Sequence, residues 1–236
     1  MREVLNILYC HGLGSSINNR VGTGLVEYFK NTPHYFERLL YRNPGSRHVP
    51  WNVSEWREDI EKRVDGNEWV VIASSAGCHA ALNAAKNRQN NIKGLFLFCP
   101  GVSLTFNYVN TLMPGGRDAL QSGRSLIHPA SRGGHEALIN RECLQHYLDT
   151  CVTNTEGLID IRCPVSIVHG TKDEMVPFEN SISLSKRLRS SEVELTLVPE
   201  GTHFLSVDQL VTKKLDVFLA TVSRHKEGLR RTSSKL

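Results

Sequence analysis

The chain has 236 residues, of which 40% are apolar and 22% charged, a composition typical of a soluble globular protein with one well-buried core. No run approaches the about 18 consecutive apolar residues that a membrane span requires, so we expect no span. Residues 1–4 lead at once into an apolar segment, without the basic and then apolar order of a secretory signal, so we expect no such signal either.

The net charge of +4 comes from one end of the chain. Residues 224–236 hold five Lys or Arg and one Glu, whereas the rest of the chain holds 23 basic and 23 acidic residues. A neutral body with a basic end argues against a nucleic-acid partner, because nucleic-acid binding needs a basic face on the domain itself.

Six cysteines show no close C-x-x-C pairing, and four of them lie in or beside strongly apolar segments: Cys10, Cys78, Cys99, Cys143, Cys151 and Cys163. We interpret them as buried free thiols in a reducing compartment rather than as a disulfide framework or a zinc site. The sequence therefore predicts no metal.

Apolar runs alternate with helical stretches along most of the chain. The predicted strands are residues 4–9, 35–41, 69–74, 94–98, 165–169 and 193–198, and the predicted helices are residues 55–64, 76–88, 178–188 and 207–223. Several strands are apolar at consecutive positions, as expected where both faces are covered. This alternation predicts an α/β fold with a doubly wound, mostly parallel sheet of about six strands.

Residues 104–157 interrupt this alternation, because no clear strand occurs there. Glycine- and proline-rich turns frame short pieces, and residues 135–151 have a helical apolar face. An insertion of this length is typical of a functional lid, so we predict a small helical cap over the catalytic face. The apolar cap residues Phe106, Tyr108, Leu112 and Met113 are candidates for an acyl pocket, although we favour a role in the cap's own core for any single one.

The first candidate catalytic motif lies at residues 70–82, where an apolar β-branched run is followed by two serines and then by an alanine-rich segment. The pattern indicates a strand, a sharp turn and a helix. Residues 73–77, Ala-Ser-Ser-Ala-Gly, match the Gly-x-Ser-x-Gly nucleophile elbow except that Ala73 replaces the first glycine. The position of Gly77 selects Ser75 as the nucleophile and leaves Ser74 as a turn residue.

A serine hydroxyl needs a histidine to take its proton and a carboxylate to hold that histidine's tautomer. Asp173 and His203 each follow an apolar strand and a glycine-containing turn, and with Ser75 they give the order serine, acid, histidine. Because doubly wound folds place ligands at the carboxyl ends of their strands, we expect these residues to meet there. Glu174 is the alternative acid, and a solvated loop position is the alternative interpretation of Asp173.

The remaining histidines carry no comparable signal. For His128, His135 and His146 in the predicted cap we expect solvated or packing roles, and His79 is expected to point along the helix that follows Ser75.

Residues 9–16 are the candidate segment for stabilising an oxyanion, because a predicted strand ends there in His-Gly-Leu-Gly. The glycines allow a tight turn that presents an amide, so we predict an oxyanion hole made by the N–H groups of Leu13 and Ala76. A phosphate-binding loop is the alternative, but the G-x-G-x-x-G and Walker spacings are missing.

Together these motifs resemble the α/β-hydrolase superfamily over roughly residues 4–223. Only two predicted strands precede the elbow, as in a compact member without the leading hairpin. Residues 163–177, with Cys-Pro-Val and His-Gly-Thr-Lys-Asp-Glu-Met-Val-Pro, resemble more narrowly the small esterase branch that includes the mitochondrial palmitoyl-protein thioesterase, also described as an acyl-glucuronide esterase. The resemblance implies a compact α/β-hydrolase domain at residues 1–223, its cap at about 104–157, and no cofactor.

The chain ends in Ser234, Lys235 and Leu236, a tripeptide that peroxisomal import receptors read. Residues 224–236 are polar and basic, so we predict a flexible tail that presents this signal to an import receptor. The predicted location is a peroxisome or related microbody, or the cytoplasm if the source is a prokaryote.

The sequence thus predicts a serine hydrolase that cleaves carboxylic esters or thioesters through an acyl-enzyme, on acyl or lipid-type substrates. A serine peptidase of the same fold is one alternative, because the same three residues support peptide cleavage. A non-catalytic ligand-binding protein with a hydrolase fold is the other.

Overall fold

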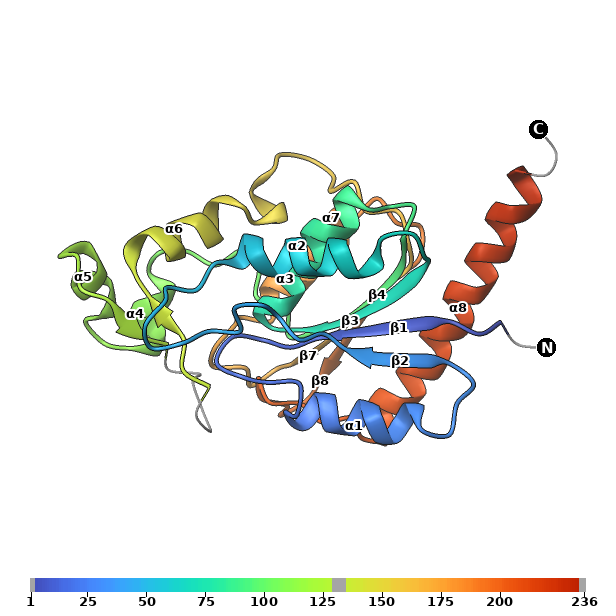
Figure 1. Cartoon of the computed structure of the whole chain (residues 1–236), viewed down its shortest axis with the longest axis horizontal. Helices are drawn as coiled ribbons and strands as arrows, with labels where there is room; N and C mark the ends of the chain where they lie inside the picture. Colours follow the sequence, from blue (N-terminus) through green and yellow to red (C-terminus); the bar gives the residue numbers. More distant parts are fainter. Residues whose placement is uncertain (1–2, 129–134, 234–236) are drawn as a thin grey trace.

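The computed structural model describes residues 3–128 and 135–233, with side chains described through residue 228. Six strands form one sheet in the order β2-β1-β3-β4-β7-β8, and every neighbouring pair is parallel (Figure 1). The strands are β1 Asn6–Cys10, β2 Tyr35–Arg38, β3 Trp69–Ser74, β4 Ile92–Phe98, β7 Val165–Gly170 and β8 Val193–Val198. All six lie where the sequence predicted them, which confirms the doubly wound parallel sheet.

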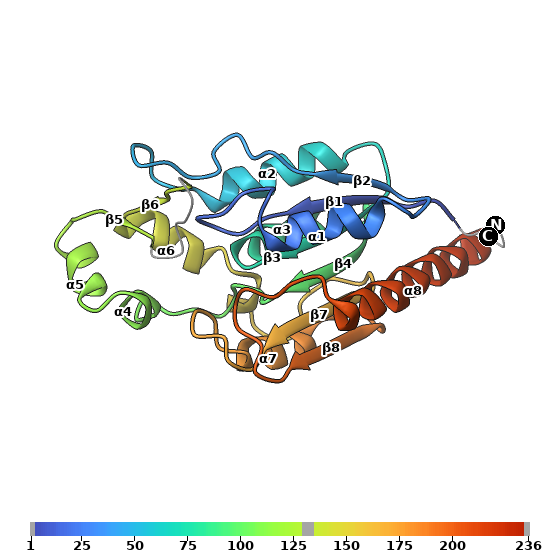
Figure 2. The ribbon, with the colours of Figure 1, turned by 90° about the horizontal axis from the view of Figure 1, so that it is seen from below.

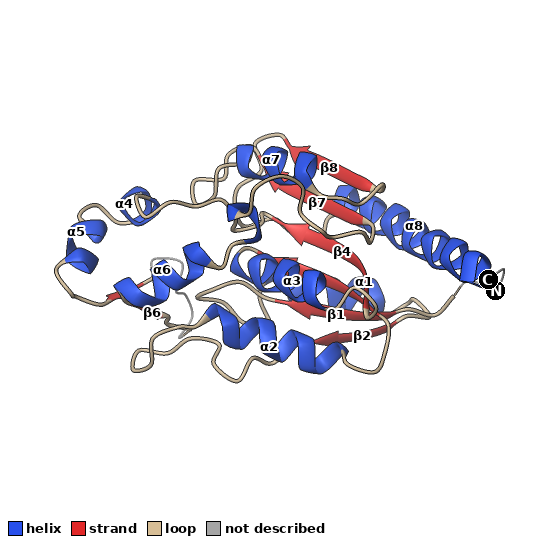
Figure 3. Ribbon diagram, turned by 90° about the horizontal axis from the view of Figure 1, so that it is seen from above, coloured by secondary structure: helices blue, strands red, loops and turns tan. Residues whose placement is uncertain are grey.

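Helices cover both faces of this sheet, with α2, α3 and α7 on one side and α1 and α8 on the other (Figures 1 and 3). Their bounds are α1 Arg20–Phe29, α2 Val53–Val64, α3 Ala76–Asn87, α7 Glu179–Arg187 and α8 Gln209–Ser233. Helix α1 was not predicted. Gly22 and Gly24 weaken its helical signal, but the Asn19 side chain caps it by accepting a hydrogen bond from the Gly22 N–H.

The central strand β3 shows why its sequence is apolar at every position. Val71 and Ala73 pack in the core beneath α2 and α3, whereas Val70 and Ile72 pack in the core beneath α1 and α8. Successive side chains of a strand point to opposite faces. A strand with a core on each side therefore has no polar face.

The cap lies beyond the carboxyl ends of the strands (Figure 2). It contains α4 Tyr108–Leu112, α5 Gly116–Gln121, β5 Leu126–Ile127, β6 Leu138–Ile139, α6 Arg141–Asp149 and the short 3₁₀ helix η1 Val152–Asn154. The sequence predicted no strand here; β5 and β6 have two residues each, too few for a periodic signal. The predicted helical face begins only at Arg141, because Asn140 caps α6 by accepting from the Cys143 N–H.

Helix α8 is longer than predicted. It was expected to end at residue 223, but it continues to Ser233. Lys226 is buried and pairs with Glu3 at 2.9 Å and with Glu68 at 2.8 Å, which ties the helix to both β1 and the start of β3. The segment that follows residue 223 is therefore helical as far as Ser233, not the free tail we predicted. No helix within the described ranges is both long and apolar enough to cross a membrane.

Three of the four buried histidines of the described residues lie outside the turn at Asp173, namely His11, His79 and His128. Burial lowers the pKa of each from its usual value to about 4, because a buried imidazolium loses its hydration. His79 Nε2 donates to the Tyr147 carbonyl at 2.9 Å, and His11 Nδ1 donates to the Gly12 carbonyl at 2.9 Å, so the neutral rings are well accommodated.

These histidines predict that acid destabilises the fold. Between about pH 6.5 and pH 4 the unfolded chain binds protons that the folded chain does not, so the free energy of unfolding falls by at most about 1.4 kcal/mol per pH unit for each histidine. We expect urea unfolding to show a smaller loss between about pH 7 and pH 5 in His79→Gln, whose amide still reaches the Tyr147 carbonyl. The exposed His48→Gln should retain the full loss; equal losses in both variants would contradict the prediction.

Candidate active site

Ser75 lies at the sharp turn between β3 and α3, with φ 51° and ψ −122°. A side chain rarely adopts positive φ, and such strain costs about 1–3 kcal/mol. Surrounding hydrogen bonds hold the turn: the Ser75 N–H donates to the Phe98 carbonyl at 2.9 Å, and the Ser75 carbonyl accepts from the Cys78 and Gly101 N–H groups at 3.0 Å each. This geometry is that of the predicted elbow.

Two glycines allow the backbone to pack closely against this turn. A Cβ at Gly77 would lie 2.5 Å from the His11 carbonyl oxygen, and a Cβ at Gly12 would lie 2.9 Å from the Cβ of Ser75. The loop after β1 therefore approaches both the nucleophile and the start of α3. Ala73, at the first elbow position, is fully buried in the core, which explains why its methyl group is accommodated.

The structure brings the three predicted residues into one chain of hydrogen bonds. His203 Nε2 lies 3.0 Å from Ser75 Oγ, and His203 Nδ1 lies 2.7 Å from Asp173 Oδ2. The three residues come from the loops after β3, β7 and β8, which end at the same edge of the sheet. Asp173, and not the exposed Glu174, contacts His203.

Each carboxylate oxygen of Asp173 accepts two hydrogen bonds. Oδ1 accepts from the Met175 and Val176 N–H groups at 2.8 Å each, and Oδ2 accepts from His203 and also from His169 Nε2 at 3.0 Å. Burial by itself would raise the pKa of Asp173, but the bonds from His169 and His203 outweigh it and hold this pKa well below its usual range. The carboxylate is therefore charged throughout the physiological range.

Sequence reasoning missed His169. It ends the apolar run of β7 four residues before Asp173, and a histidine inside an otherwise apolar strand was the available signal. Its side chain is fully buried, and only the folded turn at residues 170–176 brings the Asp173 carboxylate back onto its ring.

The two predicted oxyanion donors flank Ser75. Leu13 and Ala76 line the same cavity as Ser75, and Gly12, which precedes Leu13, lies against Ser75. Ala76 is the first residue of α3, where N–H groups lack a partner within the helix. The role of Leu13 and Ala76 as oxyanion donors stays a prediction.

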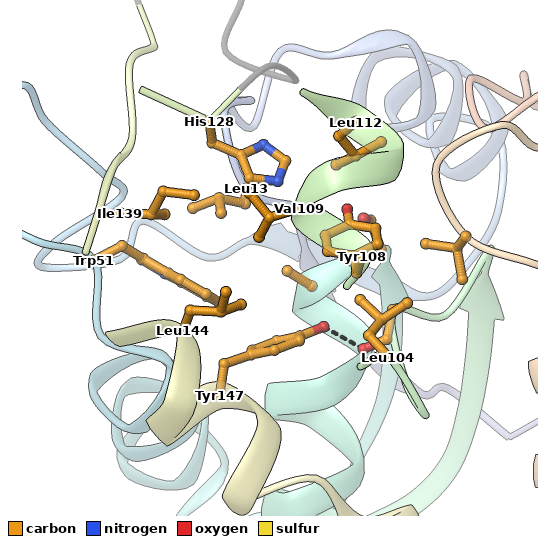
Figure 4. A pocket seen from close by; sticks show the side chains of 14 residues that line it. Leu13, Trp51, Leu104, Tyr108, Val109, Leu112, His128, Ile139, Leu144 and Tyr147 are labelled. Carbon is orange, nitrogen blue, oxygen red and sulfur yellow. Dashed lines mark hydrogen bonds between the residues drawn. The ribbon is translucent and has the colours of Figure 1, made fainter. Parts of the chain in front are cut away.

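An apolar pocket extends from Ser75 under the cap (Figure 4). The space that its lining residues enclose, including space open to solvent, is about 580 Å³. Five aliphatic side chains of its wall come from the cap and the segment that leads into it: Leu104, Val109, Leu112, Ile139 and Leu144. Of the four predicted candidates, Tyr108 and Leu112 line this pocket, and Tyr108 and Phe106 pack against the cap's own core.

A second cavity opens on the other side of Ser75, with a volume of about 950 Å³ that again includes solvent. Polar residues from the loops after β1 and β8 line it, among them Ser15, Asn19, Arg20 and His203, together with apolar residues such as Phe98 and Leu205. His203 lines this cavity and is not part of the wall of the pocket under the cap. Ser75 therefore lines two cavities, of which His203 lines only the second.

The cap histidines have solvated or packing roles, as expected, and two of them also line the cavities beside Ser75. His128 is buried and lines the apolar pocket, and His135 lines the second cavity, because the cap folds back over the strand ends. His146 has a packing role, since its Nε2 lies 2.7 Å from Ser54 Oγ. His79 bonds to the Tyr147 carbonyl and does not point at Ser75, as predicted.

Tyr147 of α6 is a further residue that the sequence did not reveal. Its hydroxyl donates to the Gly101 carbonyl, and the Gly101 N–H holds the Ser75 carbonyl (Figure 4). The tyrosine thus links the cap to the turn at Ser75. Because Tyr147 and Gly101 are far apart in the sequence, no local sequence pattern predicts this contact.

One group in the described ranges could offer three donor atoms to a metal, namely Cys99, Asp173 and His203, whose atoms lie within 4.8 Å of one another. Asp173 and His203 are already bonded to each other at 2.7 Å. Burial raises the pKa of the Cys99 thiol well above its usual value, so the thiolate that a metal requires is disfavoured. These three residues are therefore better described as an acid–histidine pair beside a buried thiol than as a metal centre.

Comparison with known proteins agrees with this geometry. No family model matches the chain. The mitochondrial palmitoyl-protein thioesterase ABHD10 of Rattus norvegicus is 25% identical over 210 residues, which cover 84% of this chain and 68% of that protein. The Mus musculus protein is 24% identical over 209 residues, with the same coverage. The chain thus spans about two thirds of the length of these relatives.

These relatives correct one prediction. They are mitochondrial by name, which points to mitochondria and contradicts the peroxisomal location and import receptor predicted from Ser234, Lys235 and Leu236. A match of three residues carries far less information than similarity over 210 residues. The tripeptide itself lies outside the described residues.

Solved structures establish the fold. Mouse α/β-hydrolase domain-containing protein 10 superimposes with a TM-score of 0.76 at 22% identity, covering 97% of this chain and 92% of its own. A monoacylglycerol lipase from Paleococcus ferrophilus gives a TM-score of 0.70 at 18% identity, covering 93% and 94%. The chain therefore has the α/β-hydrolase fold and is similar in sequence to the palmitoyl-protein thioesterase members of its esterase and thioesterase branch.

Proposed function

We propose that the protein is a serine hydrolase that cleaves carboxylic esters or thioesters through an acyl-enzyme. The observation that carries this proposal is the chain of hydrogen bonds from Ser75 through His203 to Asp173, at the mouth of an apolar pocket. Each part that acyl transfer needs is within reach of the serine: a base, a charge that orients the base, and backbone donors.

The reaction follows from these contacts. His203 Nε2 accepts the proton of Ser75 as Oγ attacks the acyl carbon, and the Leu13 and Ala76 N–H groups stabilise the oxyanion. The C–O or C–S bond to the leaving group then breaks, and His203 returns the proton to the departing alcohol or thiol. A water molecule, deprotonated by His203, next attacks the acyl-enzyme, and the acid leaves as Ser75 regains its proton.

The position of His203 indicates which part of the substrate each cavity holds. A leaving group receives its proton from His203, so it lies on the side of the serine where His203 is found, in the second cavity. The acyl group then occupies the pocket under the cap, whose wall offers aliphatic side chains. Water for the second step enters from the side of the second cavity, where His203 can deprotonate it.

An acyl chain is the substrate portion that this pocket suits. The relatives carry the name palmitoyl-protein thioesterase, and an apolar pocket beside the nucleophile supports acyl thioesters or lipid-type esters as substrates of this chain. The same relatives favour a mitochondrial location.

A fluorophosphonate probe tests the nucleophile. We expect labelling of the native protein and loss of labelling in Ser75→Ala, because only an activated serine reacts with the probe. Ser74→Ala is a matched control: the Ser74 hydroxyl lies 3.1 Å from the Tyr9 hydroxyl, away from His203, so this variant should still be labelled. A folded native protein that takes up no probe would refute the proposal.

Gly12→Ala tests the close approach of the oxyanion loop. The new methyl group would meet the Ser75 Cβ at 2.9 Å and the Ser74 carbonyl at 3.2 Å, so the loop or the nucleophile must shift. We expect kcat/KM for a p-nitrophenyl ester to fall about 100-fold, since a displacement of about 1 Å at reacting groups has effects of this size. Gly228→Ala, where a methyl group meets open space, should show native kinetics. Unchanged kcat/KM in Gly12→Ala would argue against the assigned loop.

Leu112→Ala tests the acyl pocket. Leu112 lines the pocket and is only partly buried, so its truncation enlarges the pocket at little cost in stability. With p-nitrophenyl esters of graded length, we expect the ratio of long-chain to short-chain kcat/KM to rise about tenfold, the scale of one or two methylene contacts. Leu210→Ala, at an exposed position of α8, is the control. The same ratio in all three proteins would place the acyl group elsewhere.

A further inference from the structure

A second imidazole contacts the Asp173 carboxylate. His169, the penultimate residue of β7, has a fully buried side chain whose Nε2 lies 3.0 Å from Asp173 Oδ2 and 3.1 Å from the Val176 carbonyl oxygen. Its Nδ1 lies 2.7 Å from the hydroxyl of Ser181, a buried serine of α7. The acid of the site is therefore held between two histidines and connected to a helix on the far side of the loop.

The partners of His169 fix its tautomer. Nε2 faces two acceptors, a carboxylate oxygen and a carbonyl oxygen, so Nε2 carries the hydrogen and donates. In the neutral ring Nδ1 is then an acceptor, and the Ser181 hydroxyl donates to it. Every polar atom of the ring is satisfied by this arrangement, and any other neutral arrangement leaves Nε2 without a proton opposite two acceptors.

We propose that His169 is a positioning residue of the hydrolytic reaction, which holds the Asp173 carboxylate with a second imidazole N–H, while Ser181 keeps His169 in the donating tautomer. This inference rests on the proposed function, because it assigns how the acid of that site is controlled. His169 acts through Asp173 and not on the substrate, since it lines neither cavity beside Ser75.

The arrangement has a chemical consequence beyond packing. The hydrogen bond from His169 stabilises the Asp173 charge and makes the carboxylate a weaker partner for the protonated His203 ring. Without this donor, the carboxylate holds the protonated His203 more strongly. The neutral base that attack requires then forms only at higher pH.

Arg20 and His135 line the second cavity together with His203, and three further titratable groups of the described residues lie near the Asp173–His203 pair. Cys99, after β4, and Tyr108, of α4, face Asp173, and His128 of the cap faces His203. Burial raises the pKa of the Cys99 thiol and of the Tyr108 hydroxyl and lowers that of His128 to about 4, so these three groups stay neutral near pH 7. The charge that His203 senses from this set is that of Asp173.

A purely structural role must be separated from this one, because His169 also holds the turn at residues 173–176 through the Val176 carbonyl. His169→Gln and His169→Met form a matched pair of similar length. The glutamine amide can supply an N–H where Nε2 stood, whereas the methionine fills the space without a donor. Ser181→Ala removes the hydroxyl donor, and Ser185→Ala, whose hydroxyl bonds to the Ile182 carbonyl on the same helix, is its control.

The readout is the pH dependence of kcat/KM for a p-nitrophenyl ester, together with the pH dependence of fluorophosphonate labelling of Ser75. In His169→Met we expect both acidic limbs to move to higher pH by about half a unit or more, and kcat/KM near pH 7 to fall about tenfold, the equivalent of one hydrogen bond to a charged group. His169→Gln should restore both. In Ser181→Ala, kcat/KM should fall a few-fold, as expected for the loss of a neutral hydrogen bond. Ser185→Ala should have the kcat/KM of the native protein.

Proton NMR gives a test that does not need turnover. Downfield imidazole N–H signals should come from His169 Nε2–H and His203 Nδ1–H, and His169→Met should remove one and shift the other. If His169→Met and His169→Gln lose activity equally with unmoved pH profiles, His169 is only structural and the inference fails. If no variant, nor the native protein, reacts with probe or ester, it is the proposed function that fails, a distinct outcome.

Discussion

The backbone turn at Ser75 is the constraint on which the rest of the site depends. It places a residue with a side chain in a conformation that costs about 1–3 kcal/mol, and it stays there because hydrogen bonds from β4 and the loop after it hold both the N–H and the carbonyl of Ser75. The same turn starts α3, so one local feature exposes a hydroxyl and presents a free helical N–H at Ala76.

The Asp173 carboxylate, like the Ser75 turn, is held by several hydrogen bonds. Asp173 accepts two backbone and two imidazole N–H groups, so a buried charge that would be costly in isolation is fully compensated. The histidine between this carboxylate and Ser75 comes from a different strand end. Parallel strands that end at one edge of the sheet thus bring the three loops together, and backbone hydrogen bonds join the loops after β7 and β8.

The cap decides what surrounds this chemistry. Its helices provide the aliphatic wall of one cavity, and its α6 reaches the nucleophile turn through Tyr147 and Gly101. The other cavity is formed largely by loops of the sheet itself. Ser75 therefore lines both a pocket walled largely by the insertion and a cavity formed largely by the loops of the sheet.

The sequence by itself determined the six strands, the helices that follow most of them, and the residues Ser75, Asp173 and His203, because hydrophobic periodicity and glycine-containing turns are local signals. Helix α1 was missed since two glycines weaken its pattern, and the end of α8 was misplaced since the Lys226 ion pairs join residues far apart in sequence. Only the tertiary structure revealed His169 on Asp173, Tyr147 on Gly101, His128 in the pocket wall and the two cavities. Such contacts depend on how loops and the cap return to the sheet edge, which no local pattern encodes.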